Sequence, residues 1–318
     1  MDLIDNLNEI KRQKEEYIIP ENIRKDVEVF GVTGTLEEGG GEYNSVIEPT
    51  IKNTYSSVSF SMVKINYLIL KLPSTLETDS NVTNISGLFS NCVSLTEIPF
   101  FDTSNITNMQ NMFENCYSIT TIPLFNTSNV TNMQSMFNNC NNLITIPLLD
   151  TSKITSTYNM FNGCKKLATI PLLDISDVTT VQGMFYNCTG LTEIPLLNTS
   201  NVTNMQSMFY SCTSLTTIPL LNTNKVTSMQ SMFQACTNLI TIPLLDTSSC
   251  LNMQSMFQGC TKLSDDSLNN IMKMCINTPS NYARTKSLSN IGLNGPQKVT
   301  CQTLSNYQDF LDAGWSDS

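Results

Sequence analysis

The sequence contains no histidine, few charged residues and a single tryptophan, and these shortages narrow its possible functions. Charged side chains make up 14% of the 318 residues, below the roughly one quarter that is usual in soluble proteins. Without histidine, Ser-His and Cys-His nucleophilic sites, imidazole metal ligands and the usual switch near neutral pH are excluded. We therefore expect a protein that is not an enzyme and has no catalytic residues, cofactor or metal ion.

Positive charge and long apolar runs are also scarce. The formal net charge is −10, which disfavours binding to nucleic acid or to anionic membranes. No segment approaches the ~20 apolar residues of a membrane helix, and residues 1–18 alternate apolar and charged side chains, unlike a secretory signal peptide. We expect synthesis in a cytoplasm, with no nucleic-acid partner, no membrane insertion and no export by a signal peptide.

Cysteine is abundant and regularly spaced. Eight of the eleven cysteines recur every 24 residues: Cys92, Cys116, Cys140, Cys164, Cys188, Cys212, Cys236 and Cys260. Such regularity indicates a structural repeat rather than a disulfide framework. The odd total and cytoplasmic synthesis favour reduced thiols, so we predict a column of small, buried, free cysteines. Metal binding by this column is the alternative, but the paired close spacing of zinc sites is missing.

Numbered from its cysteine as position 0, each repeat has two halves. Positions +3 to +9 (residues 215–221, for example) form a short apolar run that predicts a strand, with +3, +6 and +8 as its core positions and the proline at +7 ending the pairing. Apolar residues at +14, +17, +21 and +24 fit one face of a short helix. The cysteine, leucine, isoleucine, methionine and phenylalanine columns are assigned to the core. The predicted fold is an α/β repeat solenoid, a leucine-rich-repeat-like right-handed coil of short parallel strands and short helices.

Position +10 is always aspartate or asparagine. The column comprises Asp102, Asn126, Asp150, Asp174, Asn198, Asn222 and Asp246. Turn chemistry, in which the side chain accepts a hydrogen bond from the amide two residues on, is favoured over a calcium site because three members are neutral.

Positions +4 and +5 point away from the predicted core and form the candidate binding face. We name as the threonine face Thr96, Glu97, Thr120, Thr121, Thr145, Thr169, Thr192, Glu193, Thr216, Thr217 and Thr241. Short, uncharged hydroxyl side chains suit a flat contact with a glycan or a protein. The alternative is a sheet face that is merely soluble.

The remaining segments divide the chain further. Residues 81–263 form the predicted solenoid, 42–80 a divergent N-terminal cap with a first strand at 66–73, and 264–318 a C-terminal cap. Within the C-terminal cap we expect a helix from Ser264, a strand over 288–293, a final helix over 305–315 and Trp315 packed over the last coil.

The N-terminus is predicted to dock or to oligomerise. Residues 1–20 are predicted to form a helix with a short coiled-coil seam; its candidate docking residues are Leu3, Leu7, Ile10 and Tyr17, with Lys14 at the remaining heptad position. Residues 21–41 hold a predicted strand at 27–32 and a glycine-rich linker. A disordered terminus with accidental periodicity is the alternative.

The repeat resembles a known family. The units DTSNVTNMQSMF…C and SLTTIP are similar to the BspA-like leucine-rich repeats of bacterial surface proteins over residues 81–263, although the IPLL segment makes this coil shorter. Such repeats occur in adhesins and in phage-encoded proteins. Residues 21–37 resemble a segment of tail-associated phage proteins, and the C-terminal segments resemble an ending found with this repeat in gut phages.

These resemblances imply a non-enzymatic virion protein of a phage infecting Gram-positive or gut bacteria, associated with the tail. Residues 1–40 would contact other virion proteins or a second copy, and the solenoid would contact a glycan or protein of the host surface. A bacterial cell-surface adhesin and an intracellular protein-binding scaffold remain alternatives. An enzyme is the least favoured, because the array offers few carboxylates for glycan hydrolysis.

Overall fold

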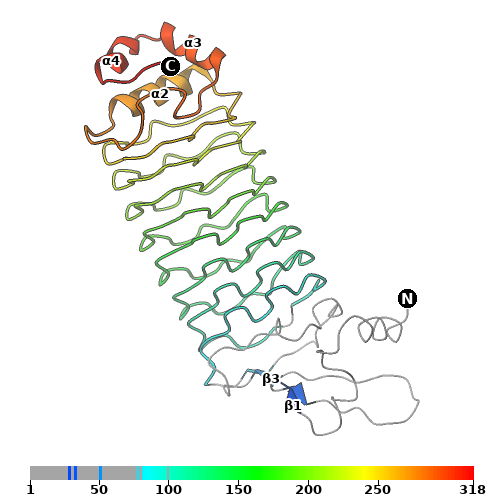
Figure 1. Ribbon diagram of the computed structural model, residues 1–318. Helices are drawn as coiled ribbons and strands as arrows, with labels where there is room; N and C mark the ends of the chain where they lie inside the picture. Colours follow the sequence, from blue (N-terminus) through cyan, green and yellow to red (C-terminus); the bar gives the residue numbers. More distant parts are fainter. Residues whose placement is uncertain (1–27, 30–31, 34–49, 52–76, 79–80, 99) are drawn as a thin grey trace, which may run out of the picture.

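The chain forms a solenoid of stacked coils. The computed structural model describes residues 28–29, 32–33, 50–51, 77–78, 81–98 and 100–318. From residue 81 onward the coils follow one another along an elongated stack, and three helices cover its C-terminal end (Figure 1). These helices are α2 (Asp265–Ile276), α3 (Gly295–Thr303) and α4 (Tyr307–Asp312).

Four short strands precede the described coils. Strand β1 (Glu28–Val29) pairs antiparallel with β2 (Val32–Thr33), and β3 (Thr50–Ile51) pairs in parallel with β4 (Glu77–Thr78). Where one strand was expected over 27–32, the structure has two short paired strands. The predicted seam of residues 1–20 and the predicted strand at 66–73 lie outside the described residues.

A column of stacked phenylalanine rings runs along the core. Neighbouring rings are nearly parallel, with centroids 5.5 to 5.8 Å apart, through Phe89, Phe113, Phe137, Phe161, Phe185, Phe209, Phe233 and Phe257. All eight side chains are fully buried, together with the cysteine, methionine and inward leucine columns. Because no coil could bury its own apolar side, the core exists only through stacking.

The predicted helix at positions +14 to +24 is wrong. Between residues 81 and 263, the described part of the chain contains no α-helix, and this half of each coil is a run of turns. Coils whose phenylalanine rings lie 5.5 to 5.8 Å apart are too close for helices, whose axes need roughly 8–10 Å. The apolar residues whose spacing suggests a helical face therefore point into the core from a run of turns.

Alternate amides in this half bond to the next coil. The amides of Asn159 and Phe161 donate to the carbonyls of Gln182 and Met184 at 3.1 and 2.9 Å. The intervening amide of Met160 closes a turn within its own coil, on the carbonyl of Thr157 at 3.0 Å. The backbone is thus satisfied without an α-helix.

Two positions per coil adopt a left-handed conformation to make this alternation possible. Asn159 and Gly163 have φ of 51° and 76°, and the equivalent residues of the other coils are asparagine, serine, glycine or, once, Ala235. Asparagine and glycine tolerate this region better than other residues do. Their recurrence explains why the half coil is rich in small polar residues.

The predicted strand at +3 to +9 is also absent as a regular element. Thr217 and Thr241 form an isolated parallel bridge here, and single backbone hydrogen bonds, such as that from the amide of Ile144 to the carbonyl of Thr120, join other coils. Side chains at positions 0, +3, +6 and +9 are buried, as for Cys140, Leu143, Ile146 and Leu149. Burial of every third residue fits an extended, polyproline II-like segment with three residues per turn. This conformation can accommodate the proline at +7.

The C-terminal cap closes the apolar end of the stack. Helix α2 begins after Ser264, whose side chain accepts a hydrogen bond from the amide of Ser267, as predicted from the sequence. Helix α3 was not predicted, although Asn294 and Gln297 form a reciprocal capping box at its start. The predicted strand over 288–293 is a turn, and the predicted final helix corresponds to α4.

Trp315 is buried within this cap. Its ring lies 5.2 Å from that of Tyr282 and 6.0 Å from that of Phe310, and its indole nitrogen donates to the hydroxyl of Thr278. None of the helices among the described residues is both long and apolar enough to span a membrane.

Candidate binding surface

The eleven residues of the threonine face are exposed. They lie on the extended segment of each coil, directly after a buried leucine or isoleucine at +3. Neighbouring coils are tied together at this position: the amide of Thr192 donates to the carbonyl of Ala168 at 3.0 Å, and the Thr192 hydroxyl donates to the same oxygen at 3.2 Å. The side chains are therefore presented on a backbone that is held from coil to coil.

A stripe of apolar side chains runs beside the threonine face. The structure exposes position +8, which the sequence assigned to the core, and buries position +9: Leu148 is 62% exposed and Leu149 is 2% exposed. We call the seven exposed +8 residues the leucine stripe: Phe100, Leu124, Leu148, Leu172, Leu196, Leu220 and Leu244, each 48 to 65% exposed.

The sequence contained a signal for this stripe. Positions +8 and +9 are both large and apolar, and adjacent side chains of an extended backbone cannot both face the same core. The burial spacing of 0, +3, +6 and +9 selects the second residue of each pair. The prediction failed because it assumed the strand register of a longer leucine-rich repeat.

The aspartate and asparagine column has the predicted turn role. The Oδ1 atom of Asp174 accepts hydrogen bonds from the backbone amide of Ser176 at 3.0 Å and from its hydroxyl at 2.7 Å. These bonds hold the pKa of the Asp174 carboxyl below its usual value. The amide bond recurs at Asp102, Asn126, Asp150, Asn198, Asn222 and Asp246.

The cysteine column is buried, and its thiols are free, as predicted. Burial raises the pKa of each thiol, for example that of Cys92 to about 12. Among the described residues, no three Cys, Asp or Glu side chains gather as a metal site would require.

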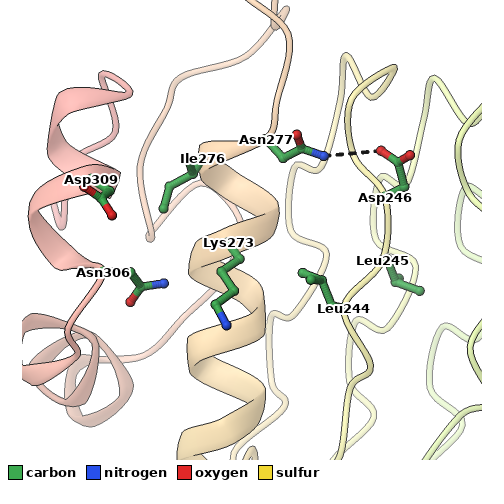
Figure 2. A pocket seen from close by; sticks show the side chains of 8 residues that line it. All are labelled: Leu244, Leu245, Asp246, Lys273, Ile276, Asn277, Asn306 and Asp309. Atoms are coloured by element: carbon green, nitrogen blue, oxygen red, sulfur yellow. Dashed lines mark hydrogen bonds between the residues drawn. The ribbon is translucent and has the colours of Figure 1, made fainter.

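A pocket of about 600 Å³ lies where the last coil meets the C-terminal cap (Figure 2). Its lining residues are Leu244, Leu245, Asp246, Lys273, Ile276, Asn277, Asn306 and Asp309. The Asp246 carboxylate is already engaged by the amide of Ser248 at 2.9 Å and by the side chain of Asn277 at 3.3 Å. The pocket is thus a seam at the end of the leucine stripe, lined by three charged side chains: Asp246 from the last coil, Lys273 from α2 and Asp309 from α4.

Charge is sparse along the exposed columns. Two of the eleven residues of the threonine face are charged, Glu97 and Glu193, and the leucine stripe has none. The arrangement offers two long, flat, mainly neutral surfaces suited to contact with another macromolecule. It presents no assembled acid, base and nucleophile along these columns.

The chain is similar to one described protein family and to solved leucine-rich repeat proteins. The family described as "Mycoplasma protein of unknown function, DUF285" matches residues 70–169 and 155–272. The leucine-rich repeat protein of T. pallidum is 19% identical, covers 63% of this chain and 83% of its own, and has a TM-score of 0.38. A leucine-rich repeat protein from Eubacterium ventriosum is 16% identical, covers 62% and 79%, and has a TM-score of 0.29. No curated protein matches the chain.

Proposed function

The chain belongs to the family described as Mycoplasma protein of unknown function, DUF285, and we propose that it is a non-enzymatic binding protein that presents its threonine face to a glycan or protein of a bacterial surface. The observation that carries this proposal is the exposure of positions +4 and +5 in every coil described. The stack thereby displays threonine side chains repeatedly along its length, with Ile144 and Ile240 exposed among them.

The physical properties of this face suit binding. Its side chains are mostly threonine, which loses little rotamer freedom when it is covered, so less entropy opposes binding than with long side chains. Hydroxyl groups both donate and accept hydrogen bonds, which allows them to meet the hydroxyls of a glycan or the backbone of a protein. Pre-organisation by the stack further lowers the cost of association.

The same geometry argues against hydrolysis as the function. The carboxylates of Asp102, Asp150, Asp174 and Asp246 each accept the amide of their own turn. Glycoside hydrolysis requires two carboxyl groups that flank one bond, with one of them protonated at working pH. The pKa of Asp150 and that of Asp174 are lowered by the turn hydrogen bonds, which is the opposite of what a general acid needs.

We further propose that the setting is a phage virion, with the solenoid facing the host and residues 1–40 facing other virion proteins. The support is the resemblance of residues 21–37 and of the C-terminal segments to phage proteins. Mass spectrometry of purified virions from the encoding phage tests this directly. Absence of the protein from the particles would favour the adhesin or the scaffold alternative.

The binding face can be tested with intact Gram-positive cells and their isolated wall glycans as probes. The test variant carries Thr121→Glu, Thr145→Glu, Thr169→Glu and Thr217→Glu. We expect its binding to the cells, measured by flow cytometry with the fluorescently labelled full chain, to fall at least about tenfold, because each buried, unpaired carboxylate costs on the order of 1 kcal/mol or more.

The control uses a second exposed threonine column on the other half of the coil. It carries Thr131→Glu, Thr155→Glu, Thr179→Glu and Thr203→Glu, so charge and composition change equally. Loss of binding in the control variant alone would place the contact on that column. Equal binding by both variants and the unmodified chain would exclude the threonine face.

A further inference from the structure

We propose that the leucine stripe is the interface through which two copies of this chain associate. The stripe consists of the seven +8 residues from Phe100 to Leu244, each 48 to 65% exposed. This inference goes beyond the proposed function, because it concerns self-association rather than ligand binding.

The stripe is continuous along the stack. Four residues before it, the amide of Ile144 donates to the carbonyl of Thr120, and the amide of Ile240 to that of Thr216, both at 2.9 Å. Such contacts keep neighbouring coils about 4.8 Å apart, as paired strands are, so seven rungs extend over roughly 29 Å. Each exposed leucine therefore lies directly beside the next.

The exposed apolar area is large for a surface left in water. At on the order of 100 Å² per side chain, the seven side chains offer roughly 700 Å² of apolar surface. The largest apolar patch of a typical monomer is about 300–600 Å². A stable interface buries about 800 Å² per partner, which the stripe nearly supplies alone.

A second copy is the partner that fits this surface best. A twofold interface requires a patch that is complementary to itself. A column of six leucines and Phe100 at a constant rise meets the same column of a second copy with matching ridges and gaps. An unrelated globular surface lacks this spacing.

The surroundings of the stripe resemble an interface rim. From Pro123 to Pro243 the adjoining +7 position is a half-buried proline, and the carboxylates of Asp150 and Asp174 lie at +10, two residues beyond the leucines. Polar groups at the edge of an apolar strip are typical of protein interfaces. Since these carboxylates repel their counterparts on a second copy, association should strengthen as salt screens them.

Leu172 gives the geometry a direct test, because it is the fourth of the seven rungs. When two stripes overlap fully, Leu172 meets the Leu172 of the second copy whether they run parallel or antiparallel. The full chain with Leu172→Cys should therefore form a covalent dimer on mild oxidation, with loss of two protons and two electrons to an added oxidant such as oxidised glutathione. The native thiols, being buried, give little background.

Thr155→Cys is the matched control, since Thr155 is exposed on the other half of the coil. Cross-linking of Leu172→Cys at a rate at least about tenfold above that of Thr155→Cys supports the interface. Equal rates, or no covalent dimer, would overturn it.

A second experiment removes the stripe's apolar character. We expect the full chain to sediment as a dimer, and Leu148→Glu with Leu196→Glu to weaken the dimer at least about 100-fold, because two carboxylates of each copy would be desolvated. Thr155→Glu with Thr203→Glu should leave the dimer intact. A monomeric unmodified chain, or an assembly unaffected by the leucine changes, would refute the proposal and, in the second case, direct attention to residues 1–20. No host ligand is present in either experiment, so failure here leaves the proposed binding function untouched.

Discussion

The thiol of Cys164 donates a hydrogen bond to the carbonyl oxygen of Phe137, 3.1 Å away in the preceding coil. The same oxygen accepts the backbone amide of Cys140 at 3.0 Å, so both of its lone pairs are used. The thiol bond recurs at 2.9 to 3.1 Å for Cys116, Cys140, Cys188, Cys212, Cys236 and Cys260. The cysteine column therefore combines a small apolar volume with a donor that joins successive coils.

Replacing Cys164 tests both roles. Cys164→Ala removes the donor and leaves a small cavity, and we expect a loss of about 1–2 kcal/mol, because the Phe137 oxygen keeps its bond from Cys140. Cys164→Ser retains a donor and should lose less. Differential scanning calorimetry of the two variants decides, and a serine variant that is less stable than the alanine variant would show that the thiol contributes by packing alone.

Alkaline pH should destabilise the protein. The pKa of each buried thiol is raised above its ordinary value of 9.0, to about 12 for Cys260 and about 11 for Cys250 and Cys301. Because the folded-state pKa is the higher one, the stabilisation is complete below pH 9 and is lost as pH rises through the folded-state values. Between pH 9 and its folded-state pKa, each thiol lowers the free energy of unfolding by up to about 1.4 kcal/mol per pH unit.

Melting temperatures at several pH values between 7 and 11 measure this effect. A variant with Cys140→Ser and Cys164→Ser carries two fewer ionisable groups, so its melting temperature should fall less steeply with pH. Identical pH dependence of the variant and the unmodified chain would mean that other groups, such as Tyr282, whose pKa is also raised by burial, control alkaline stability.

Adjacent leucines should differ sharply in their contribution to folding. Leu149→Ala empties a position that is 2% exposed, and we expect a loss of about 2–4 kcal/mol. Leu148→Ala alters a side chain that is 62% exposed and should cost less than about 0.5 kcal/mol in the dilute monomer. Urea unfolding at low protein concentration measures the free energy of unfolding of both variants. A larger loss for Leu148→Ala than for Leu149→Ala would support the leucine-rich-repeat register assumed from the sequence.

Ala235 is an engineering target because it has a φ of 61°. A non-glycine residue in the left-handed region is strained by about 1 kcal/mol, so Ala235→Gly should raise stability by about 0.5–1 kcal/mol. Ala168→Gly is the control: Ala168 is exposed and does not have a positive φ, and the added chain entropy should lower stability. Destabilisation by both substitutions would contradict the strain argument.

Much of the core could be predicted from the sequence. The columns of Cys164, Leu167 and Phe161 recur at a spacing that a stack can bury, and the Asp174 column is followed by the serine that its turn requires. These assignments depend on residue type and on local hydrogen bonds within a few residues. They do not depend on how far apart the coils lie.

The backbone conformation of the two halves of the coil could not be predicted correctly from the sequence. Apolar residues at +14, +17, +21 and +24 fit a helical face and also fit a run of turns with left-handed residues such as Asn159. Likewise, the pair Leu148 and Leu149 leaves open which residue faces inward. The prediction of free, buried thiols is confirmed, whereas the helix and the core position of the +8 column are wrong.

The sequence by itself determined which residues are repeated, that the cysteine, methionine and phenylalanine columns lie in the core, and that each aspartate or asparagine column forms a turn, because these follow from residue chemistry and short-range bonding. Only the tertiary structure decided that the coils lie 5.5 to 5.8 Å apart at their phenylalanines. That distance excludes helices and brings alternate amides within reach of the neighbouring coil, and the burial of every third residue in the extended half places position +9 in the core. Leu172 and its equivalents at +8 therefore lie on the surface, although the sequence predicted them in the core.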